Sequence, residues 1–407
     1  MKILIVSQSF YPDHFKINEL IKDFAKAGHE VTVLSGLGDY TTGKVHPNYR
    51  FFRNRTEQYN GCTVKRVRTI SRRTGPIFRS LNYLSFWFFG SIWAFFAAKK
   101  FDMVYVYQPS PATMIYPGIT AAKRSQAPLL IYCLDIWPEA VKAMSIQEES
   151  MPFRMIHKLS THAYQQASFI LVSSQSFLTY MHEVNHIPYE KMAFLPQHAE
   201  DSLEIPKEIP ISIQQAKHNF VFTGNIGYVQ DIETIIKATA LVPKDYDFRV
   251  HIVGDGSNLA TCQQLAKELQ LEEKVVFYGR QPSHLMPVFY DMADACLLTL
   301  KYENKIGLTI PAKLQGYMAA GKPVLAAIEG DAKQVIKEAD CGLCVAASDE
   351  QGLADGLVQF MAYSPQELKQ MGENAKTYVA AHFTKDTFVT KTLETMKKLV
   401  RKKGSHD

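Results

Sequence analysis

A lysine near the start of a predicted helix is the first candidate for chemistry in this sequence. Pro311 fits the first turn of a helix that ends near Gly321, and Thr309 could cap it. Lys313 would then lie in the first turn, where a cation opposes the helix dipole. A bound anion would stabilise the lysine there, and a solvated lysine is the alternative interpretation.

A glycine-containing turn earlier in the same half could bind the same anion. The segment Phe222-Thr-Gly-Asn-Ile-Gly-Tyr-Val-Gln-Asp231 follows a predicted strand and precedes a predicted helix. Gly224 and Gly227 allow close approach of the backbone, and the helix would direct free N–H groups at the anion. Val253-Gly-Asp-Gly-Ser257 is a second such turn, for which we expect a structural role first, because Gly-Asp-Gly suits tight turns generally.

The elements that must position these turns alternate between strands and helices. Ile17–Ala27 is a predicted helix with Gly28 as its C-cap. The predicted strands are Lys2–Val6, Glu30–Gly36, Thr63–Val67, Met103–Tyr107, Leu129–Leu134, Phe169–Val172 and Met192–Phe194, then Asn219–Thr223, Phe248–Gly254, Val275–Tyr278, Ala295–Leu300, Pro323–Ala327 and Gly342–Val345. This alternation predicts an α/β fold with parallel sheets and helices on both faces.

The length of 407 residues predicts more than one domain. Gln197 to Gln215 is rich in proline and charge and has no periodicity, as is typical of a linker between domains. We therefore expect an N-terminal domain over residues 1–200, a C-terminal domain over 216–384, and a helix with a basic tail over 385–407 that returns to the N-terminal domain. Ligands of two such sheets are expected in a cleft between their carboxyl ends.

Composition narrows the class of protein. Hydrophobic residues make up 46% and charged residues 21%, which is globular, and a net charge of +5 does not by itself indicate nucleic acid. The six cysteines are scattered rather than arranged as a disulfide framework, which indicates a reducing compartment. The opening run after Met1 predicts a buried strand rather than a signal peptide.

A basic and aromatic segment over residues 44–98 predicts contact with a membrane surface. Ten Lys and Arg lie between Lys44 and Arg79, with Glu57 as the one acidic residue, and the apolar run Leu81–Ala98 follows at once. Basic residues attract anionic lipid, and Trp and Phe suit the interface. We expect an interfacial helix; a buried core helix and a membrane span are the alternatives. The segment matches no nucleic-acid-binding module, so we expect no nucleic acid partner.

Seven segments carry a resemblance to a known family. They are Phe10-Tyr-Pro-Asp-His-Phe-Lys-Ile-Asn18, Gly28-His-Glu-Val-Thr-Val-Leu-Ser-Gly36, Asn82-Tyr-Leu-Ser-Phe86, Tyr107-Gln-Pro-Ser-Pro111, Leu134-Asp-Ile-Trp-Pro-Glu139, Thr223-Gly-Asn-Ile-Gly227 and Tyr317-Met-Ala-Ala-Gly-Lys-Pro323. In this order the chain resembles GT-B glycosyltransferases of family GT4. It is most similar to the branch that builds bacterial capsule, O-antigen and colanic-acid repeat units, which includes N-acetyl-fucosaminyl transferases.

The resemblance implies two Rossmann-like doubly wound domains and transfer from a nucleotide sugar, most often UDP-linked, to a polyprenyl-diphosphate-linked saccharide. It implies retention of configuration, no cofactor, and work at the cytoplasmic face of a membrane. It assigns Asp135 and Lys313 as catalytic. The donor residues that it implies are Asn225, Gly227, Tyr228, Gln230, Gly254, Arg280, Glu303, Thr309, Lys313 and Leu314, and the acceptor residues are Asp13, Lys16, Asn18, Gln108 and Glu139.

Two departures from the family pattern narrow the subfamily. Many relatives carry two glutamates with seven residues between them before the Met-Ala-x-Gly helix, but one alignment gives Asn304 and Ala312 at these positions and the other gives Leu308 and Gly316. Glu303 is the nearest carboxylate. The usual Arg and Lys pair after the diphosphate turn is also absent, with Gln230 where the second would stand, so that Lys313 is the candidate to neutralise the diphosphate.

Glycosyl transfer develops charge on a leaving diphosphate and on an oxocarbenium-like sugar. Helix N-termini, backbone amides and Lys313 could stabilise the diphosphate without a metal, so we expect metal independence. We expect Asp135 to act on the acceptor side, with a helix N-cap as the alternative role and Glu139 as a second candidate base. Two rival functions are a GT-B nucleotide-sugar 2-epimerase and a non-catalytic GT-B subunit that activates a partner.

Overall fold

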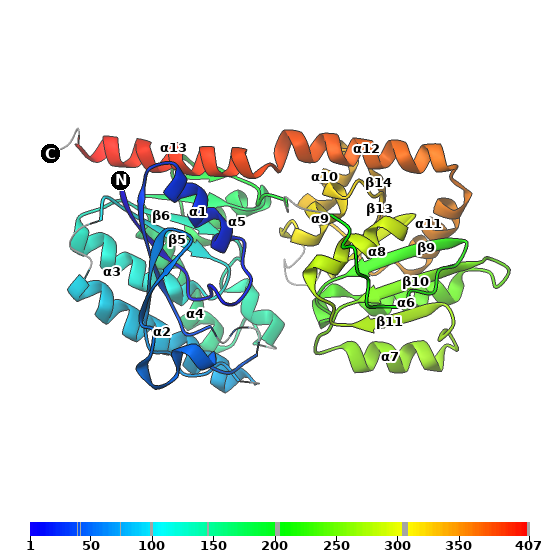
Figure 1. Cartoon of the computed structure of the whole chain (residues 1–407), viewed down its shortest axis with the longest axis horizontal. Coiled ribbons are helices and arrows are strands. Elements are labelled where there is room, and N and C mark those ends of the chain that lie inside the picture. Colours follow the sequence, from blue (N-terminus) through cyan, green and yellow to red (C-terminus); the bar gives the residue numbers. More distant parts are fainter. Residues whose placement is uncertain are drawn as a thin grey trace. The chain divides into compact units, whose positions relative to one another are not determined.

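A computed structural model describes residues 1–38, 40, 42–73, 75–97, 101–144, 146–199, 204–302 and 308–404. The chain divides into two compact units (Figure 1). Unit 1 comprises Met1–Leu195 and Phe388–Asp407, and unit 2 comprises Pro196–Thr387. In each unit helices cover both faces of a sheet, as the alternation in the sequence predicts.

The described part of unit 1 contains an eight-stranded sheet in the order β3-β4-β2-β1-β5-β6-β7-β8. All neighbours are parallel except β3 and β4. The strands are β1 (Lys2–Val6), β2 (Glu30–Ser35), β3 (Thr56–Tyr59), β4 (Cys62–Arg66), β5 (Met103–Gln108), β6 (Leu129–Cys133), β7 (Phe169–Val172) and β8 (Met192–Phe194). The helices are α1 (Ile17–Lys26), α2 (Pro76–Ala97), α3 (Ile115–Ser125), α4 (Met151–Gln165) and α5 (Ser176–Asn185), with 3-10 turns η1 (Pro47–Phe52), η2 (Ala112–Met114), η3 (Glu139–Met144) and η4 (Tyr189–Lys191).

The described part of unit 2 contains a six-stranded, fully parallel sheet in the order β11-β10-β9-β12-β13-β14. The strands are β9 (His218–Thr223), β10 (Phe248–Val253), β11 (Val275–Gly279), β12 (Ala295–Thr299), β13 (Val324–Ala327) and β14 (Gly342–Val345). The helices are α6 (Ile232–Leu241), α7 (Leu259–Glu268), α8 (Met286–Met292), α9 (Ala312–Ala319), α10 (Asp331–Glu338), α11 (Glu350–Ala362) and α12 (Pro365–His382), with 3-10 turns η5 (Tyr228–Gln230) and η6 (Ser283–Leu285). These two sheets confirm the predicted fold class.

Strand β3 is the element that the sequence analysis missed. It pairs antiparallel with β4 as a hairpin whose turn is Asn60-Gly61, and both turn residues have positive φ, 51° and 78°. Asn-Gly is a strong hairpin signal. The strand itself is polar and part-exposed at the edge of the sheet, so it lacks the apolar pattern that identifies the others.

The last helix, α13 (Lys385–Gly404), supplies apolar side chains to the core of unit 1. Phe388, Leu393 and Met396 are buried there with residues of β1 and β6. The Phe388 ring meets the Tyr132 ring edge-on, with centroids 5.0 Å apart. This packing confirms that the C-terminal helix returns to the N-terminal region (Figure 1).

Helix α2 contains the apolar run and has two different faces. Its inner face is buried and packs on α3, and Gly90 permits the contact because an added Cβ would lie 2.8 Å from Pro117 Cγ. Its outer face exposes large apolar side chains: Ile77, Leu81, Leu84, Phe88, Ile92, Phe95 and Phe96. Neither a wholly buried helix nor a wholly exposed one describes α2. Across the described residues, no helix has the combined length and apolarity needed to cross a membrane.

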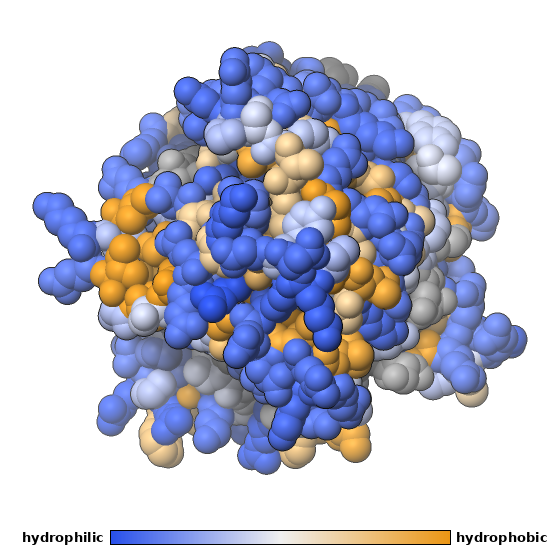
Figure 2. Space-filling model, turned by 90° about the vertical axis from the view of Figure 1, so that its right-hand side faces the viewer, coloured by the Kyte–Doolittle hydropathy of each residue, from blue (hydrophilic) through white to orange (hydrophobic). Residues whose placement is uncertain are grey.

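The surface of unit 2 has a different character. The face in Figure 2, from the unit 2 side of Figure 1, is mainly hydrophilic, with separate hydrophobic patches. The exposed large hydrophobic residues of unit 2 in the described ranges are Ile205, Ile209, Tyr228, Leu241, Leu269 and Tyr302. They come from separate segments rather than from one helix, which sets α2 apart.

Candidate functional site

The glycine-containing turn of unit 2 begins where β9 ends. Gly224 adopts φ 127° and donates its N–H to Val253 O at 2.9 Å. The side-chain oxygen of Gln230 accepts from Asn225 Nδ2 at 2.8 Å and from the Gly227 N–H at 3.1 Å. Gln230, which stands where many relatives have a basic residue, therefore braces the turn by bonds to Asn225 and Gly227.

The second turn packs directly on the first. Gly254 has φ 153°, and a Cβ built on it would lie only 1.8 Å from Gly224 O. The Ile226 N–H donates to Asp255 O, which joins the two turns again. Gly254 therefore has the structural role that we expected for this turn, and it also borders the cavity described below.

Lys313 lies beneath the first turn, in the first turn of α9. Its Nζ is 3.8 Å from the centroid of the Phe222 ring and lies close to Gly224, where a Cβ would be 3.3 Å from it. The Nζ is buried and has no hydrogen-bond partner among the described residues. Burial lowers the pKa of Lys313 to about 7, because the charged form loses its hydration. Lys313 thus places a buried amine, without a hydrogen-bond partner among the described residues, beside a turn of the type that binds anions.

Helix α9 begins at Ala312, two residues later than a cap at Thr309 would place it. Pro311 is its N-cap, in extended conformation, so Thr309 is part-buried before the helix and is not the cap. The sequence analysis placed Leu314 at the donor, but its side chain is fully buried in the core of unit 2. Its N–H donates to Pro311 O. Leu314 therefore supports α9 from the core side.

Two residues that the sequence analysis did not select hold the turn in place. The Tyr317 hydroxyl accepts from the Thr223 N–H at 2.9 Å. Asp231, buried and with φ 53°, accepts from Thr234 Oγ1 at 2.9 Å and Ser348 Oγ at 2.6 Å. The sequence predicts a capping role for an aspartate at the start of a helix, but it does not predict a hydrogen bond from a serine more than a hundred residues away.

Tyr228 is half-exposed on the outer side of the same turn. The Lys301 ammonium lies 3.6 Å from its ring centroid and 3.9 Å from an Asp231 carboxylate oxygen. A cation over an aromatic face is a favourable contact, so Lys301 links the turn to the end of β12.

A cavity of about 260 Å³ opens beside the two turns. Among its lining residues are Asn225, Gly254 and Arg280, three of the predicted donor residues, together with Gly224 and Asp255. Arg280 is exposed, directly after β11. Glu303 and the alternative position Asn304 lie outside the described residues.

In unit 1, Asp135 follows β6 at the carboxyl edge of the sheet. Burial of its carboxyl raises the pKa to about 7. Its backbone carbonyl accepts from Gln108 Nε2 at 3.0 Å, and Gln108 is fully buried. Gln108, predicted as an acceptor residue, thus holds the Asp135 segment in place. A carboxyl that titrates near neutral pH could accept or donate a proton.

Glu139 is already paired. One of its oxygens is 2.6 Å from Lys142 Nζ, and the other accepts from the Tyr180 hydroxyl at 2.8 Å. Lys142 also bonds Glu148 at 2.6 Å. Because the Glu139 carboxylate already contacts a cation and a phenol, the geometry favours Asp135 over Glu139 as the acceptor-side group.

The loop before α1 is held by its own polar residues. Asn18 accepts from the Tyr11 N–H at 3.2 Å and donates to Asp13 O at 2.7 Å. The Asp13 carboxylate accepts from the Tyr40 N–H at 3.0 Å, and Lys16 is part-buried at the N-cap of α1. Asp13, Lys16 and Asn18, all predicted acceptor residues, therefore lie in one short braced segment.

The described residues contain no group of three or more His, Cys, Asp or Glu side chains placed to hold a metal ion. Metal independence stays a prediction.

Two family descriptions match the two halves of the chain. A model described as Glycosyl transferase 4-like domain matches residues 16–198, and one described as Glycosyl transferases group 1 matches residues 207–378. The chain is a GT4 group 1 glycosyltransferase. The first match covers the segment with Asp135, and the second covers both turns and Lys313.

Among curated relatives, the chain is 29% identical to "Probable glycosyltransferase WbjE" of Pseudomonas aeruginosa over 60% of this chain and 62% of that protein. It is 29% identical to N-acetyl-alpha-D-glucosaminyl L-malate synthase of Bacillus anthracis over 47% of each. It is 24% identical to the lipopolysaccharide 1,6-galactosyltransferase of Escherichia coli over 49% of this chain and 56% of that one. The chain thus spans about half to three fifths of the length of these relatives.

Solved structures agree on the fold of the glycosyltransferase. Sucrose-phosphate synthase of Thermosynechococcus elongatus has a TM-score of 0.78 at 17% identity, covering 98% of this chain and 99% of that one. HepE of Anabaena in complex with UDP has a TM-score of 0.69 at 17% identity, covering 98% and 100%. WaaG, a glycosyltransferase involved in lipopolysaccharide biosynthesis, has a TM-score of 0.67 at 15% identity, covering 97% and 99%. These likenesses show the GT-B fold.

Proposed function

We propose that this glycosyltransferase moves a sugar from a UDP-linked donor, an N-acetylated or deoxy amino sugar, to a polyprenyl-diphosphate-linked saccharide in bacterial surface polysaccharide synthesis. Transfer is retaining and metal-independent. The lipopolysaccharide galactosyltransferase and WaaG among its likenesses support the pathway class, and the UDP complex of HepE supports the nucleotide.

The observation that carries the donor half of the proposal is the buried Lys313 ammonium. It lies at Gly224 and has no hydrogen-bond partner among the described residues. A diphosphate at this turn supplies the missing negative charge and restores the charged lysine. As the glycosidic bond to the diphosphate breaks, negative charge grows on the leaving oxygens, and a fixed ammonium stabilises it.

In the cavity beside the turns, Asn225 and Arg280 are placed to contact the nucleotide. Tyr228 faces solvent from the diphosphate turn and contributes to the donor site. Gln230 acts through the turn that it braces.

On the acceptor side, Asp135 orients the attacking hydroxyl. Its raised pKa leaves it able to exchange a proton near neutral pH. Gln108 holds the Asp135 backbone in place, and the braced loop from Asp13 to Asn18, with the positive charge of Lys16, contributes to acceptor binding.

The enzyme works on the inner face of the cell membrane, docked through unit 1. The apolar outer face of α2 and the neighbouring Arg72 and Arg73 support docking, because anionic headgroups attract the arginines while apolar rings enter the interface. Reversing both charges should weaken binding to vesicles that contain anionic lipid. Reversing Lys267 and Lys337 of unit 2, which are exposed, is the matched control; equal binding by both double variants would contradict docking through unit 1.

Release of UDP from a panel of UDP-sugars, measured with a membrane extract that contains lipid-linked saccharides, tests the transfer itself. Lys313→Met should abolish release, and Lys237→Met, which removes an exposed lysine paired with Glu350, should not. Conversion of a UDP-sugar to its 2-epimer in the absence of acceptor would indicate the 2-epimerase instead. Full activity of Lys313→Met together with Asp135→Asn would overturn the site.

A further inference from the structure

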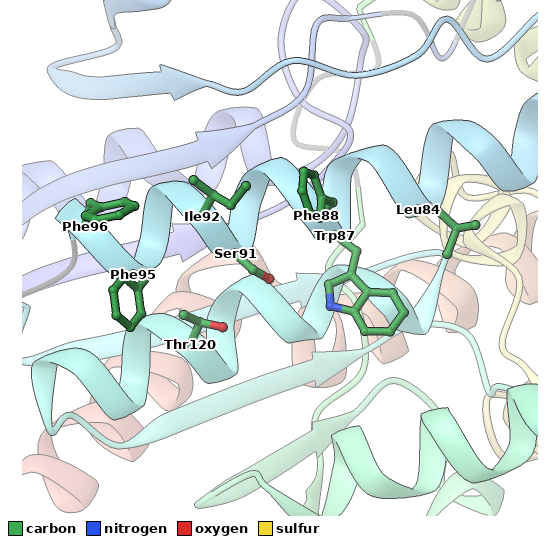
Figure 3. Close-up of a pocket in the computed structure, with 8 residues that line it drawn as sticks. All are labelled: Leu84, Trp87, Phe88, Ser91, Ile92, Phe95, Phe96 and Thr120. Carbon is green, nitrogen blue, oxygen red and sulfur yellow. The ribbon is translucent and has the colours of Figure 1, made fainter.

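A long apolar groove runs along α2 on the surface of unit 1. It has a volume of about 650 Å³ and is lined by seven side chains of α2 between Leu84 and Phe96 and by Thr120 of α3. Figure 3 shows Trp87, Ser91 and Phe95 pointing toward α3, while Phe88, Ile92 and Phe96 lie on the outer side. At 1.5 Å per residue the lined stretch is about 18 Å long.

The groove is held open by ordered contacts rather than by loose side chains. The Trp87 ring stacks on Tyr116 of α3, with centroids 4.4 Å apart. At the other end, Arg124 of α3 donates to Phe95 O at 3.0 Å, and its guanidinium lies 4.5 Å from the centre of the Phe95 ring. The short side chains of Ser91 and Thr120 face each other between these two anchors and leave the space (Figure 3).

The beginning of α2 reaches the Asp135 segment. Tyr83, one turn before Trp87, meets the Trp137 ring edge-on, with centroids 6.4 Å apart. Asn82 accepts from Gln8 Nε2 at 2.7 Å, and Gln8 lies just after β1 at the carboxyl edge of the sheet. The groove therefore starts beside the acceptor residues of unit 1 and leads away from them.

Positive charge gathers at this near end. The Arg72 guanidinium lies 5.7 Å from the Tyr83 ring centroid. Arg79 lies in the first turn of α2, four residues before Tyr83, and therefore on the same side of the helix as Tyr83. An amphiphile with an anionic head and a long hydrocarbon tail matches this order: arginines first, then an apolar channel.

We propose that the α2–α3 groove is a subsite for the isoprenoid chain of the lipid-linked acceptor, with its diphosphate at Arg72 and Arg79. The inference rests on the proposed function and names the part of the acceptor that unit 1 holds. The bilayer meets the outer edge of α2, whereas one chain, drawn from the bilayer, fills the groove and brings its saccharide to Asp135. An extended chain suits a groove lined by rings and aliphatic side chains, because apolar burial needs no directional partner.

The test compares two probes that share a headgroup and differ in chain length, geranylgeranyl diphosphate and isopentenyl diphosphate, by calorimetric titration of the full chain without detergent. The long-chain probe should bind at least about tenfold more tightly, since each buried methylene adds to affinity. Ile92→Asp places a charge in the groove at a side chain that is already 42% exposed, so folding should survive. It should remove the advantage of the long chain and leave the short probe unchanged.

Ile77→Asp is the matched control, because Ile77 is an exposed isoleucine of the same helix that does not line the groove. It should leave both affinities within about twofold of the parent protein. Equal affinities of the parent protein for the two probes would overturn the proposed isoprenoid subsite. Equal losses of affinity in both variants would also overturn it, because they would show that α2 is a general interfacial face. UDP release from the donor is measured in a separate assay that contains neither probe. A negative result for the groove therefore leaves the proposed transferase activity untouched, and a negative result for transfer is detected independently of the groove.

Discussion

The Lys313 ammonium lies 3.8 Å from the centre of the Phe222 ring, with the glycine turn directly above it. The ring face provides a weak attraction for a cation but not the hydrogen bonds that an ammonium had in water. The free protein therefore keeps this lysine at an energetic cost, which a bound diphosphate would offset.

That cost predicts a stabilised variant. Replacing Lys313 by Met keeps the length of the side chain and removes the buried amine. At pH 7 the free variant should therefore melt at a higher temperature than the parent, with an unfolding free energy larger by up to about a few kcal/mol. The folded pKa of about 7 lies below the unfolded value, so the unfolded chain binds more protons between about pH 7 and pH 10. Stability of the parent should rise with pH through this window, and that of Lys313→Met should lack this rise. Identical pH profiles in thermal melts would contradict the burial of the amine.

The same lysine predicts how UDP affinity depends on pH. Binding of a diphosphate favours the protonated lysine, so its pKa rises in the complex. The affinity of the free protein should be greatest below about pH 7 and fall as pH rises, by at most about tenfold per unit. Dividing the parent affinity by the Lys313→Met affinity at each pH removes the contribution from protonation of the nucleotide itself. A constant affinity ratio between parent and variant from pH 6 to about pH 9 would place the diphosphate elsewhere.

Gly254 predicts a steric failure of the donor site. A Cβ at this position would lie 1.8 Å from Gly224 O, at φ 153°, so Gly254→Ala should separate the two turns, destabilise the protein by about 3 kcal/mol or more, and abolish UDP binding. Gly279→Ala is the control: it has a positive φ of 63° but open space around its Cβ, and strain alone costs about 1 kcal/mol. Similar melting temperatures for the two variants would show that the contact is not limiting.

Asp135 predicts the pH profile of transfer. Its pKa of about 7 exceeds the unfolded value, so the carboxyl becomes charged as pH rises from about 6 to 8. If the carboxylate orients the acceptor hydroxyl, kcat/KM should rise through this range, and Asp135→Asn should lower kcat/KM by at least about a hundredfold and flatten this limb. Because the folded state binds the extra proton between about pH 4 and pH 7, parent stability should fall across that interval and that of the variant should not. If Asp135→Asn kept the same rise of kcat/KM with pH, that rise would belong to another group.

Much of the scaffold follows from local pattern. Every predicted strand is present, with ends that shift by at most one residue, because strands buried on both faces are continuous apolar runs. The exception, Thr56–Tyr59, is a polar edge strand. Its Asn60-Gly61 turn was visible in the sequence, and the missing apolar pattern hid the strand beside it.

Candidate site residues could be selected from the sequence where one segment contains the signal, and not where distant segments meet. Lys313 was found from its place in a helix, but the Phe222 ring beside it comes from a strand about ninety residues away. Gln230 and Gln108 were selected as ligand contacts, and in the structure the Gln230 side-chain oxygen accepts from the Gly227 N–H while Gln108 Nε2 donates to the Asp135 carbonyl. Sequence shows which side chains can bond, whereas only the fold shows which bonds are already made.

Helix α13 has a consequence for how the chain is made. Phe388, Leu393 and Met396 complete a core whose other members come from the first half of the chain. During synthesis, the core of unit 1 is incomplete and part of its apolar interior is uncovered until residue 396 has left the ribosome. All strands of the unit 2 sheet are synthesised before that point. The half that is translated first is therefore the last to become complete, and its exposed interior in that interval is where a chaperone would bind.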